Sequence, residues 1–97
     1  MSKPRKGRRI VAAAIMLQDG RVICGVRHFD KHMRSVIDGM SGGKPDTIIK
    51  GAMQGFVCND YEFVARDEAW LIALRAGQFD PKDVTGQQGT LYSENLW

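Results

Sequence analysis

Three consecutive residues, Arg27-His28-Phe29, combine side chains that suit a phosphate-bearing nucleotide. A guanidinium group forms paired, charge-assisted hydrogen bonds with phosphate oxygens, an imidazole can donate to them, and a phenyl ring offers a face on which a base can stack. The alternative is structural: a surface arginine, a histidine at the start of a helix and a phenylalanine in the core. These residues alone favour neither interpretation.

Two later segments carry similar chemistry. Gln54-Gly55-Phe56 begins a predicted strand, and Gly55 would let a ligand or another backbone approach closely. Arg66 directly precedes a predicted helix, where free N–H groups and the helix dipole attract anions. Its alternative role is a surface ion pair with a neighbouring acid. Ala65 stands where a helix N-cap would favour Asn, Ser or Asp.

We expect no metal site and no catalytic residue. His28 and His32 have the i, i+4 spacing that can hold one metal ion from a single helix face, but a third ligand is missing. Cys24 and Cys58 lie far away in sequence and have no CxxC spacing. The serines lack a His–Asp relay at a recognisable spacing, and there is no nucleophile-elbow pattern. The sequence therefore favours a non-enzymatic binding protein without a cofactor.

The segment from Val11 to Arg27 resembles the first two strands of Nudix hydrolases, with an apolar strand, an Asp-Gly turn and a second strand that ends in Gly-x-Arg. Nudix catalysis needs a helix with several glutamates that hold a divalent metal ion at a diphosphate. The predicted helix that begins near Asp67 carries only Glu68. Nudix activity is therefore excluded.

The first half of the chain predicts a hairpin followed by a helix. Residues 10–17 are apolar throughout, which is typical of a strand buried on both faces, and residues 22–26 form its partner. Asp19-Gly20 suits the tight turn between them. From Phe29 to Met40 the apolar residues have helical spacing, with Asp30 near the positive end of the helix. Residues 41–50 are expected to form a polar loop.

The second half repeats this pattern. Residues 55–58 and 61–64 predict another hairpin, and a helix follows from Asp67, with Trp70, Leu71 and Leu74 as its apolar stripe and Gly77 after its end. The final residues, 91–97, are expected to dock on the domain. The order predicts an α+β fold with a mostly antiparallel sheet built from two β-hairpins, each followed by a helix.

The charge is unevenly distributed along the 97 residues. The formal net charge is +3, but residues 1–9 hold five of the fourteen basic residues, and from Ile10 onward nine basic residues face eleven acidic ones. We therefore expect a flexible basic arm, 1–9, and a single ligand-binding domain, 10–97. The arm is either an anion or nucleic-acid contact or a solubilising tail. No apolar run is long enough to span a bilayer, and both cysteines are expected to be reduced and partly buried.

Several short elements occur in an order that resembles the first-described family of phage anti-Thoeris sponge proteins. They are Ile10-Val-Ala-Ala-Ala14, Ile23-Cys-Gly-Val-Arg-His-Phe29, Gln54-Gly-Phe56, Phe63-Val-Ala-Arg-Asp-Glu-Ala69, Ala76-Gly-Gln78 and Leu91-Tyr-Ser-Glu-Asn-Leu-Trp97. They are spread from Ile10 to Trp97, so the basic arm lies outside the resemblance.

This resemblance implies a phage anti-defence protein in the cytoplasm of the host bacterium. Proteins of that family bind cyclic ADP-ribose isomers, the glycocyclic signals that TIR-domain enzymes make from NAD in Thoeris immunity, and do not hydrolyse them. Members are homodimers with the ligand at the subunit interface. Some are hexamers, trimers of dimers, that also take up the cyclic trinucleotides of CBASS immunity.

The resemblance also implies which residues meet the ligand. Arg27 and Arg66 would neutralise phosphates, Phe56 would stack on adenine, and Asn95 would make a polar contact. Together with the chemistry of the segments described above, the expected ligand-binding residues are Arg27, His28, Phe29, Met33, Gln54, Phe56, Arg66 and Asn95. The main alternative is a small nucleic-acid-binding phage protein that uses the basic arm, for which binding would depend steeply on salt.

Overall fold

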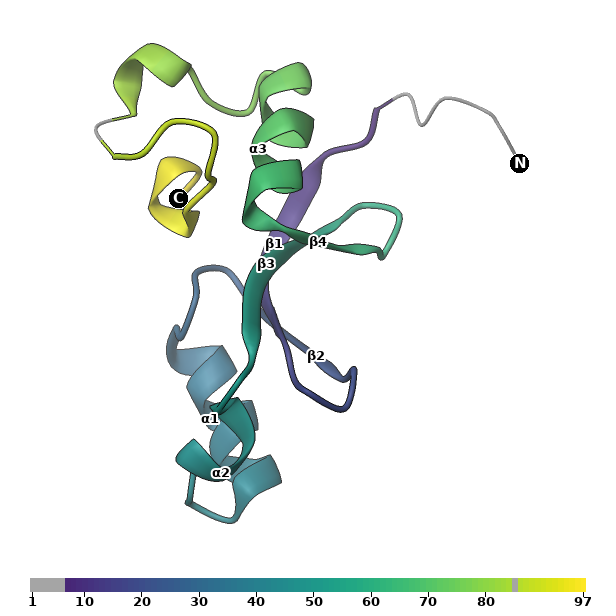
Figure 1. Ribbon diagram of the computed structural model, residues 1–97, viewed down its shortest axis with the longest axis vertical. Coiled ribbons are helices and arrows are strands. Elements are labelled where there is room, and N and C mark those ends of the chain that lie inside the picture. Colours follow the sequence, from purple (N-terminus) through teal and green to yellow (C-terminus); the bar gives the residue numbers. More distant parts are fainter. Residues whose placement is uncertain (1–6, 85) are drawn as a thin grey trace.

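The computed structural model describes residues 7–84 and 86–97. Four strands form one antiparallel sheet in the order β2-β1-β3-β4, and helices follow each hairpin (Figure 1). This confirms the α+β fold predicted from the sequence. The elements are β1 (Ile10–Met16), β2 (Val22–Gly25), α1 (Lys31–Ser41), α2 (Asp46–Ile49), β3 (Met53–Cys58), β4 (Phe63–Ala65), α3 (Arg66–Arg75) and the 3-10 turns η1 (Pro81–Asp83) and η2 (Ser93–Asn95).

Both hairpins are present. In the first, Gly20 has φ +92° and the backbone N–H of Leu17 donates to the carbonyl oxygen of Arg21, so the Asp-Gly turn lies where the sequence predicts it. In the second, β3 begins at Met53, and Tyr61 occupies a left-handed position with φ +69°. Glycine or asparagine is more usual at such a position because a β-carbon is disfavoured there.

Local signals define the ends of α1. The Asp30 carboxylate accepts a hydrogen bond from the backbone N–H of Met33 at 2.8 Å, and Gly42 ends the helix with φ +63°. The helix begins at Lys31, two residues later than the sequence pattern suggested, because Phe29 has φ +56° and the cap residue is extended. Phe29 therefore belongs to the loop between β2 and α1.

The expected polar loop 41–50 was wrong in part, because it contains the short helix α2. Ile48 and Ile49 of this helix pack against a buried cluster. Burial of these two apolar side chains holds the segment against the domain. The sequence analysis missed this contact because the neighbouring residues are polar.

The apolar stripe of α3 also differs from the prediction. The residues that it buries are Ala69, Trp70, Ile72 and Ala73, whereas Leu71 and Leu74 are 49% and 38% exposed. Small alanine side chains let the helix lie close to the sheet, and this contact fixes which way the helix is turned. Gly77 follows the helix in the predicted place, with φ +69°.

Two buried clusters lie on one face of the sheet, called here the helix face. Around α3 the cluster consists of Ile10, Ala13, Phe56, Cys58, Val64, Ala69, Trp70, Ile72, Ala73 and Leu91. Around α1 it consists of Ile15, Leu17, Ile23, Met33 and Ile37. Figure 1 shows α3 over one end of the sheet, α1 and α2 over the other, and η2 between them.

On the opposite face of the sheet, called here the open face, none of the described strand residues is charged. By strand register it presents Ala12, Ala14, Met16, Val22, Cys24, Met53, Gly55, Val57, Phe63 and Ala65. Met53 is 54% exposed, Val22 is 39% exposed and Cys24 is exposed, whereas Cys58 is buried in the helix face. This face is therefore apolar and accessible in the isolated chain.

Residues 1–6 of the expected basic arm lie outside the described residues. The last part of that segment contacts the turn after β3. The Arg8 guanidinium lies 3.0 Å from the carboxylates of Asp60 and Glu62 and 3.6 Å from that of Glu68. The backbone N–H of Arg9 donates to the side-chain oxygen of Asn59. Within the described residues, no helix is long and apolar enough to cross a membrane.

Candidate functional site

Three basic residues of the helix face lie around the C-terminal segment, which packs between the two buried clusters. Arg27 and His28 come from the loop after β2, and Arg66 is the first residue of α3. We call Arg27, His28 and Arg66 the cation cluster. The C-terminal segment, residues 91–97, contacts all three and lies between α1 and α3 (Figure 1).

Arg66 is held in place by one amide and one aromatic ring. Its terminal nitrogen donates to the Gln54 side-chain oxygen at 2.6 Å, and its guanidinium carbon lies 4.6 Å from the centre of the Tyr92 ring. Its Nε atom is buried and has no hydrogen-bond partner. Among the described residues, no carboxylate forms an ion pair with Arg66. The group therefore keeps its full positive charge and one unused donor.

His28 is held by the sheet. Its Nε2 lies 2.6 Å from the carbonyl oxygen of Gly55, and its ring meets that of Phe56 edge-on, with ring centres 5.0 Å apart. The Nδ1 atom is buried and has no partner. Burial is the main cause that lowers the pKa of His28 below its usual value, and the nearby positive charge of Arg66 lowers it further. The neutral imidazole is therefore favoured.

Arg27 and Asn95 both engage the C-terminal segment. The exposed Arg27 side chain donates to the main-chain oxygen of Trp97. Asn95 accepts a hydrogen bond from the backbone N–H of Tyr92 at 2.8 Å, which closes the turn η2. In this conformation Asn95 shapes the segment that covers the cation cluster, and its side-chain oxygen is already used.

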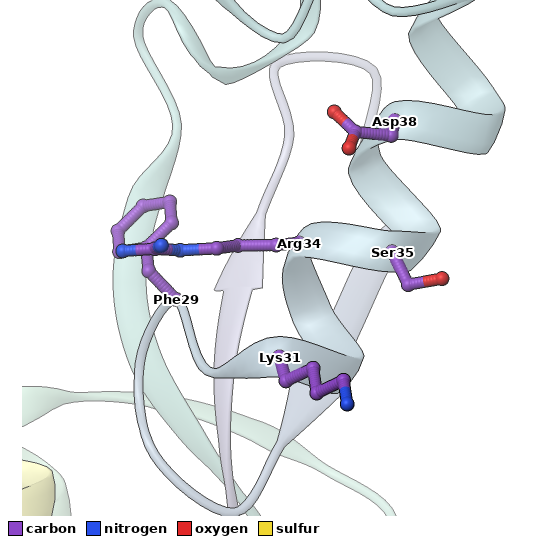
Figure 2. A pocket seen from close by; sticks show the side chains of 5 residues that line it. All are labelled: Phe29, Lys31, Arg34, Ser35 and Asp38. Atoms are coloured by element: carbon purple, nitrogen blue, oxygen red, sulfur yellow. The ribbon is translucent and has the colours of Figure 1, made fainter.

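Phe29 and Met33 do not join the cation cluster. Phe29 lines a surface depression of about 600 Å³ together with Lys31, Arg34, Ser35 and Asp38. Figure 2 shows that the Phe29 and Arg34 side chains point toward one another, whereas Lys31 and Ser35 point away from them. Met33 is fully buried, and its sulfur accepts from the backbone N–H of Phe29. The left-handed backbone at Phe29 separates its ring from the His28 ring.

A stacking role for Phe56 does not fit its position. Its side chain is 0% exposed and belongs to the cluster around α3. A base could reach this ring only if the core opened, which would cost more than a stacking contact of roughly 1–3 kcal/mol provides. Phe56 instead supports the edge of the His28 ring. Phe56 therefore supports the site from the core and does not line it.

Sequence reasoning missed three contacts from the C-terminal segment. Tyr92 stacks on Arg66, the Ser93 hydroxyl accepts from the backbone N–H of His28 at 3.3 Å, and the main-chain oxygen of Trp97 binds Arg27. The sequence Tyr92-Ser93 in a segment expected to dock was a usable signal, because an aromatic ring can stack on an arginine and a hydroxyl group can accept a hydrogen bond. Only the folded chain shows which cations they meet.

The cluster offers fixed donors for an anion and one acceptor. Two guanidinium groups can bind phosphate or carboxylate oxygens, and the neutral imidazole presents an unshared electron pair. Within residues 7–84 and 86–97, no group of three His, Cys, Asp or Glu side chains is close enough together to hold a metal ion. The arrangement can therefore bind and orient an anionic polar molecule.

Comparison with known proteins places the chain in one phage family. A family profile described as Phage T4 y16D protein matches residues 9–97. No curated protein and no solved structure matches. The matched range includes every strand and helix of the fold and all residues of the cation cluster. Since only the first eight of the 97 residues lie outside the match, the chain belongs to the Phage T4 y16D protein family.

Proposed function

We propose that this phage protein is an anti-defence sponge that binds and sequesters cyclic ADP-ribose isomer signals made by TIR-domain enzymes of the Thoeris system, without hydrolysing them. The resemblance described above suggests the ligand, and membership of a phage protein family fits this biological setting. The proposed place of action is the cytoplasm of the infected bacterium. Uptake of CBASS cyclic trinucleotides belongs to the same proposal.

The observation that carries the proposal is the Arg66 guanidinium, which among the described residues has no carboxylate partner and holds a buried Nε without a hydrogen-bond partner. Arg27 contacts the same C-terminal segment through the main-chain oxygen of Trp97, and its side chain is exposed. A protein that only needed stability would pair the Arg66 charge or expose it fully, since an unpaired charge is costly to desolvate. A diphosphate-bearing ligand supplies the missing negative charge.

Sequestration requires affinity and no reactive group. A Kd near 10 nM corresponds to about −11 kcal/mol. Charge-assisted hydrogen bonds contribute roughly 1.5–3 kcal/mol each, and a stacking contact about 1–3 kcal/mol. Two arginines and one aromatic residue can approach the required total if they are held in place before the ligand arrives. Gln54 does this for Arg66.

The decisive experiment distinguishes binding from cleavage. The protein is incubated with cyclic ADP-ribose isomers, separated from free ligand and denatured by heat, and the released nucleotide is analysed. Recovery of intact ligand is the expected result. Recovery of a cleaved product would show an enzyme, and no retained ligand for any isomer would refute the sponge.

Matched arginine variants locate the site. Arg27→Gln and Arg66→Gln each remove a proposed phosphate contact, whereas Arg75→Gln removes an exposed arginine at the far end of α3. We expect the first two variants to retain far less ligand and the third to match the unmodified protein. Equal retention by all three would move the site away from the cation cluster.

Self-association is part of the proposal, and the open face is the surface that fits it, although association there leaves the cation cluster on the other face of the sheet and not at the interface that the resemblance implies. A continuous apolar sheet face without charge is unusual on a monomer, and a second copy offers the same chemistry. Met53→Glu places a charge on this face. Leu71→Glu is a matched control, because Leu71 has similar exposure but lies on α3. Sedimentation should show weaker association for Met53→Glu alone.

The second candidate is nucleic-acid binding. Lys31 and Arg34 are exposed in the first turns of α1, where the helix dipole disfavours positive charge, so an external polyanion would suit them. This function predicts a steep loss of affinity with salt and a requirement for residues 1–9. The sponge predicts that ligand binding survives deletion of residues 1–6.

A further inference from the structure

We infer that His28 is a specificity-determining residue whose Nδ1 accepts a hydrogen bond from a hydroxyl or amino group of the ligand. The inference rests on the proposed function, since it concerns the same site. It adds a requirement that the arginines do not impose. A ligand must present a hydrogen-bond donor beside its negative charge, so the unprotonated oxygens of a diphosphate bridge alone cannot satisfy the site.

The contacts of the ring fix its tautomer. The carbonyl oxygen of Gly55 has no hydrogen to give, so Nε2 at 2.6 Å must carry the proton and donate it. In the neutral ring the other nitrogen then carries the free electron pair. The orientation expected from the sequence, in which the histidine donates to phosphate, would need a second proton on the ring.

The free nitrogen is enclosed and has no partner. Nδ1 is buried, while the Phe56 ring supports one side of the imidazole and the sheet another. Buried polar atoms in folded proteins nearly always have a partner. The second unpartnered nitrogen of the cluster, Nε of Arg66, is a donor, so the space holds one unused acceptor and one unused donor.

The C-terminal segment links access to Nδ1 with binding at the arginines. Ser93 contacts the His28 backbone, and its neighbours Tyr92 and Trp97 contact Arg66 and Arg27. A ligand that takes these two guanidinium groups replaces the contacts of the segment. The proposal requires that the same displacement releases Ser93 from the His28 backbone and gives the ligand access to the buried Nδ1.

Several groups set the charge state of the ring. From α3 the positive charge of Arg66 opposes protonation, while Glu94 of η2 and the carbonyl oxygens of Gly55 and Ala14 in the sheet favour it. Burial has the largest effect and also opposes protonation, so the pKa of His28 is lowered. Acid converts the acceptor into a donor, and binding of a donor-bearing ligand should therefore weaken once the ring is protonated.

Two substitutions separate the functions of the two ring nitrogens. His28→Gln can still donate to Gly55 through its amide, but it lacks an acceptor at the position of Nδ1. His28→Asn places a carbonyl oxygen near that position and does not reach Gly55. With cyclic ADP-ribose as the calorimetric probe, we expect His28→Gln to bind about tenfold more weakly than His28→Asn. Thermal melting of both variants controls for the fold.

A pH series and a modified probe extend the test. Binding by the unmodified protein should fall as acid protonates His28, and His28→Asn should lack this fall. Cyclic inosine diphosphate ribose lacks the amino group: weaker binding than cyclic ADP-ribose assigns the donor to the amine, and equal binding assigns it to a hydroxyl.

The inference can fail separately from the proposed function. If the unmodified protein binds cyclic ADP-ribose but the two His28 variants bind equally and the pH series is flat, the His28 assignment is wrong while the sponge stands. If no probe binds, both are wrong. Nitrogen NMR of the ligand-free protein gives an independent test, because a proton found on Nδ1 at pH 7.5 overturns the assignment whatever the ligand.

Discussion

Replacing Arg66 by methionine should remove ligand binding at a small cost in stability. Methionine keeps much of the length and the apolar stem of arginine, but it removes the charge. The substitution loses the hydrogen bond to Gln54 and the contact with the Tyr92 ring. It also removes the buried Nε that has no partner. These terms have opposite signs, and their balance decides the result.

The magnitudes can be compared directly. A hydrogen bond from a charged group contributes about 1.5–3 kcal/mol and an arginine–aromatic contact about 0.5–1 kcal/mol, so the loss is roughly 2–4 kcal/mol. Removing a buried polar group that lacks a partner recovers about 1–3 kcal/mol. We expect Arg66→Met to lower the free energy of unfolding by about 1 kcal/mol. The lost phosphate contact should weaken cyclic ADP-ribose binding by about 10- to 150-fold.

Urea denaturation and calorimetry with cyclic ADP-ribose measure the two effects on the same protein sample. The reasoning requires that they differ in size. A loss of stability of 4 kcal/mol or more would mean that Arg66 is chiefly a structural residue. Unchanged affinity in a folded variant would mean that the guanidinium does not meet the ligand.

Three further predictions concern stability. Gly55→Ala should destabilise the protein by about 1–3 kcal/mol in urea denaturation, because a β-carbon would overlap a carbonyl oxygen of β4. Gly39→Ala in α1 meets open space and should stabilise the protein by up to about 1 kcal/mol, and similar effects of the two variants would contradict this packing. The free energy of unfolding should fall as the pH drops below about 6.5, because the histidine of the unfolded chain then takes up a proton that buried, neutral His28 resists. Urea denaturation at several pH values should show a smaller fall for His28→Asn, and an equal fall would refute this. Arg8→Leu should lower the melting temperature more than Arg21→Leu, and equal shifts would contradict this. Arg8 lies within 3.6 Å of three carboxylates and its side chain is 18% exposed, whereas Arg21 pairs with one acid in solvent.

The parts of the fold that could be predicted depend on local chemistry. Asp19-Gly20 specifies its turn because glycine adopts a positive φ at little cost, and Asp30 and Gly42 set the ends of α1 for equally local reasons. The apolar run 10–17 and the short apolar segments on either side of the turn residues predicted both hairpins. None of these features requires knowledge of a distant residue.

The parts that could not be predicted depend on contacts across the chain. Leu71 looked like a core residue, but the orientation of α3 on the sheet leaves it exposed. Phe56 looked available for stacking, but the packing of α3 and the C-terminal segment encloses it. For the site, the sequence indicated Gln54, His28 and Arg66, which come together, and Arg27, which contacts the same C-terminal segment. It predicted that residues 91–97 dock on the domain, but not which of them contact these side chains.

Four departures from local stability rules lie around the cation cluster, whereas the left-handed Tyr61 and the unpartnered buried hydroxyl of Ser41 lie elsewhere. Ala65 begins α3 without a side-chain cap directly before Arg66, and Phe29 has a left-handed backbone directly after His28. Nδ1 of His28 and Nε of Arg66 are buried without partners. Each departure costs stability, and elsewhere the same chain caps α1 with Asp30 and ends it with Gly42. Because folded chains tolerate such costs mainly where function requires them, their concentration here is an independent reason to place the ligand between α1 and α3.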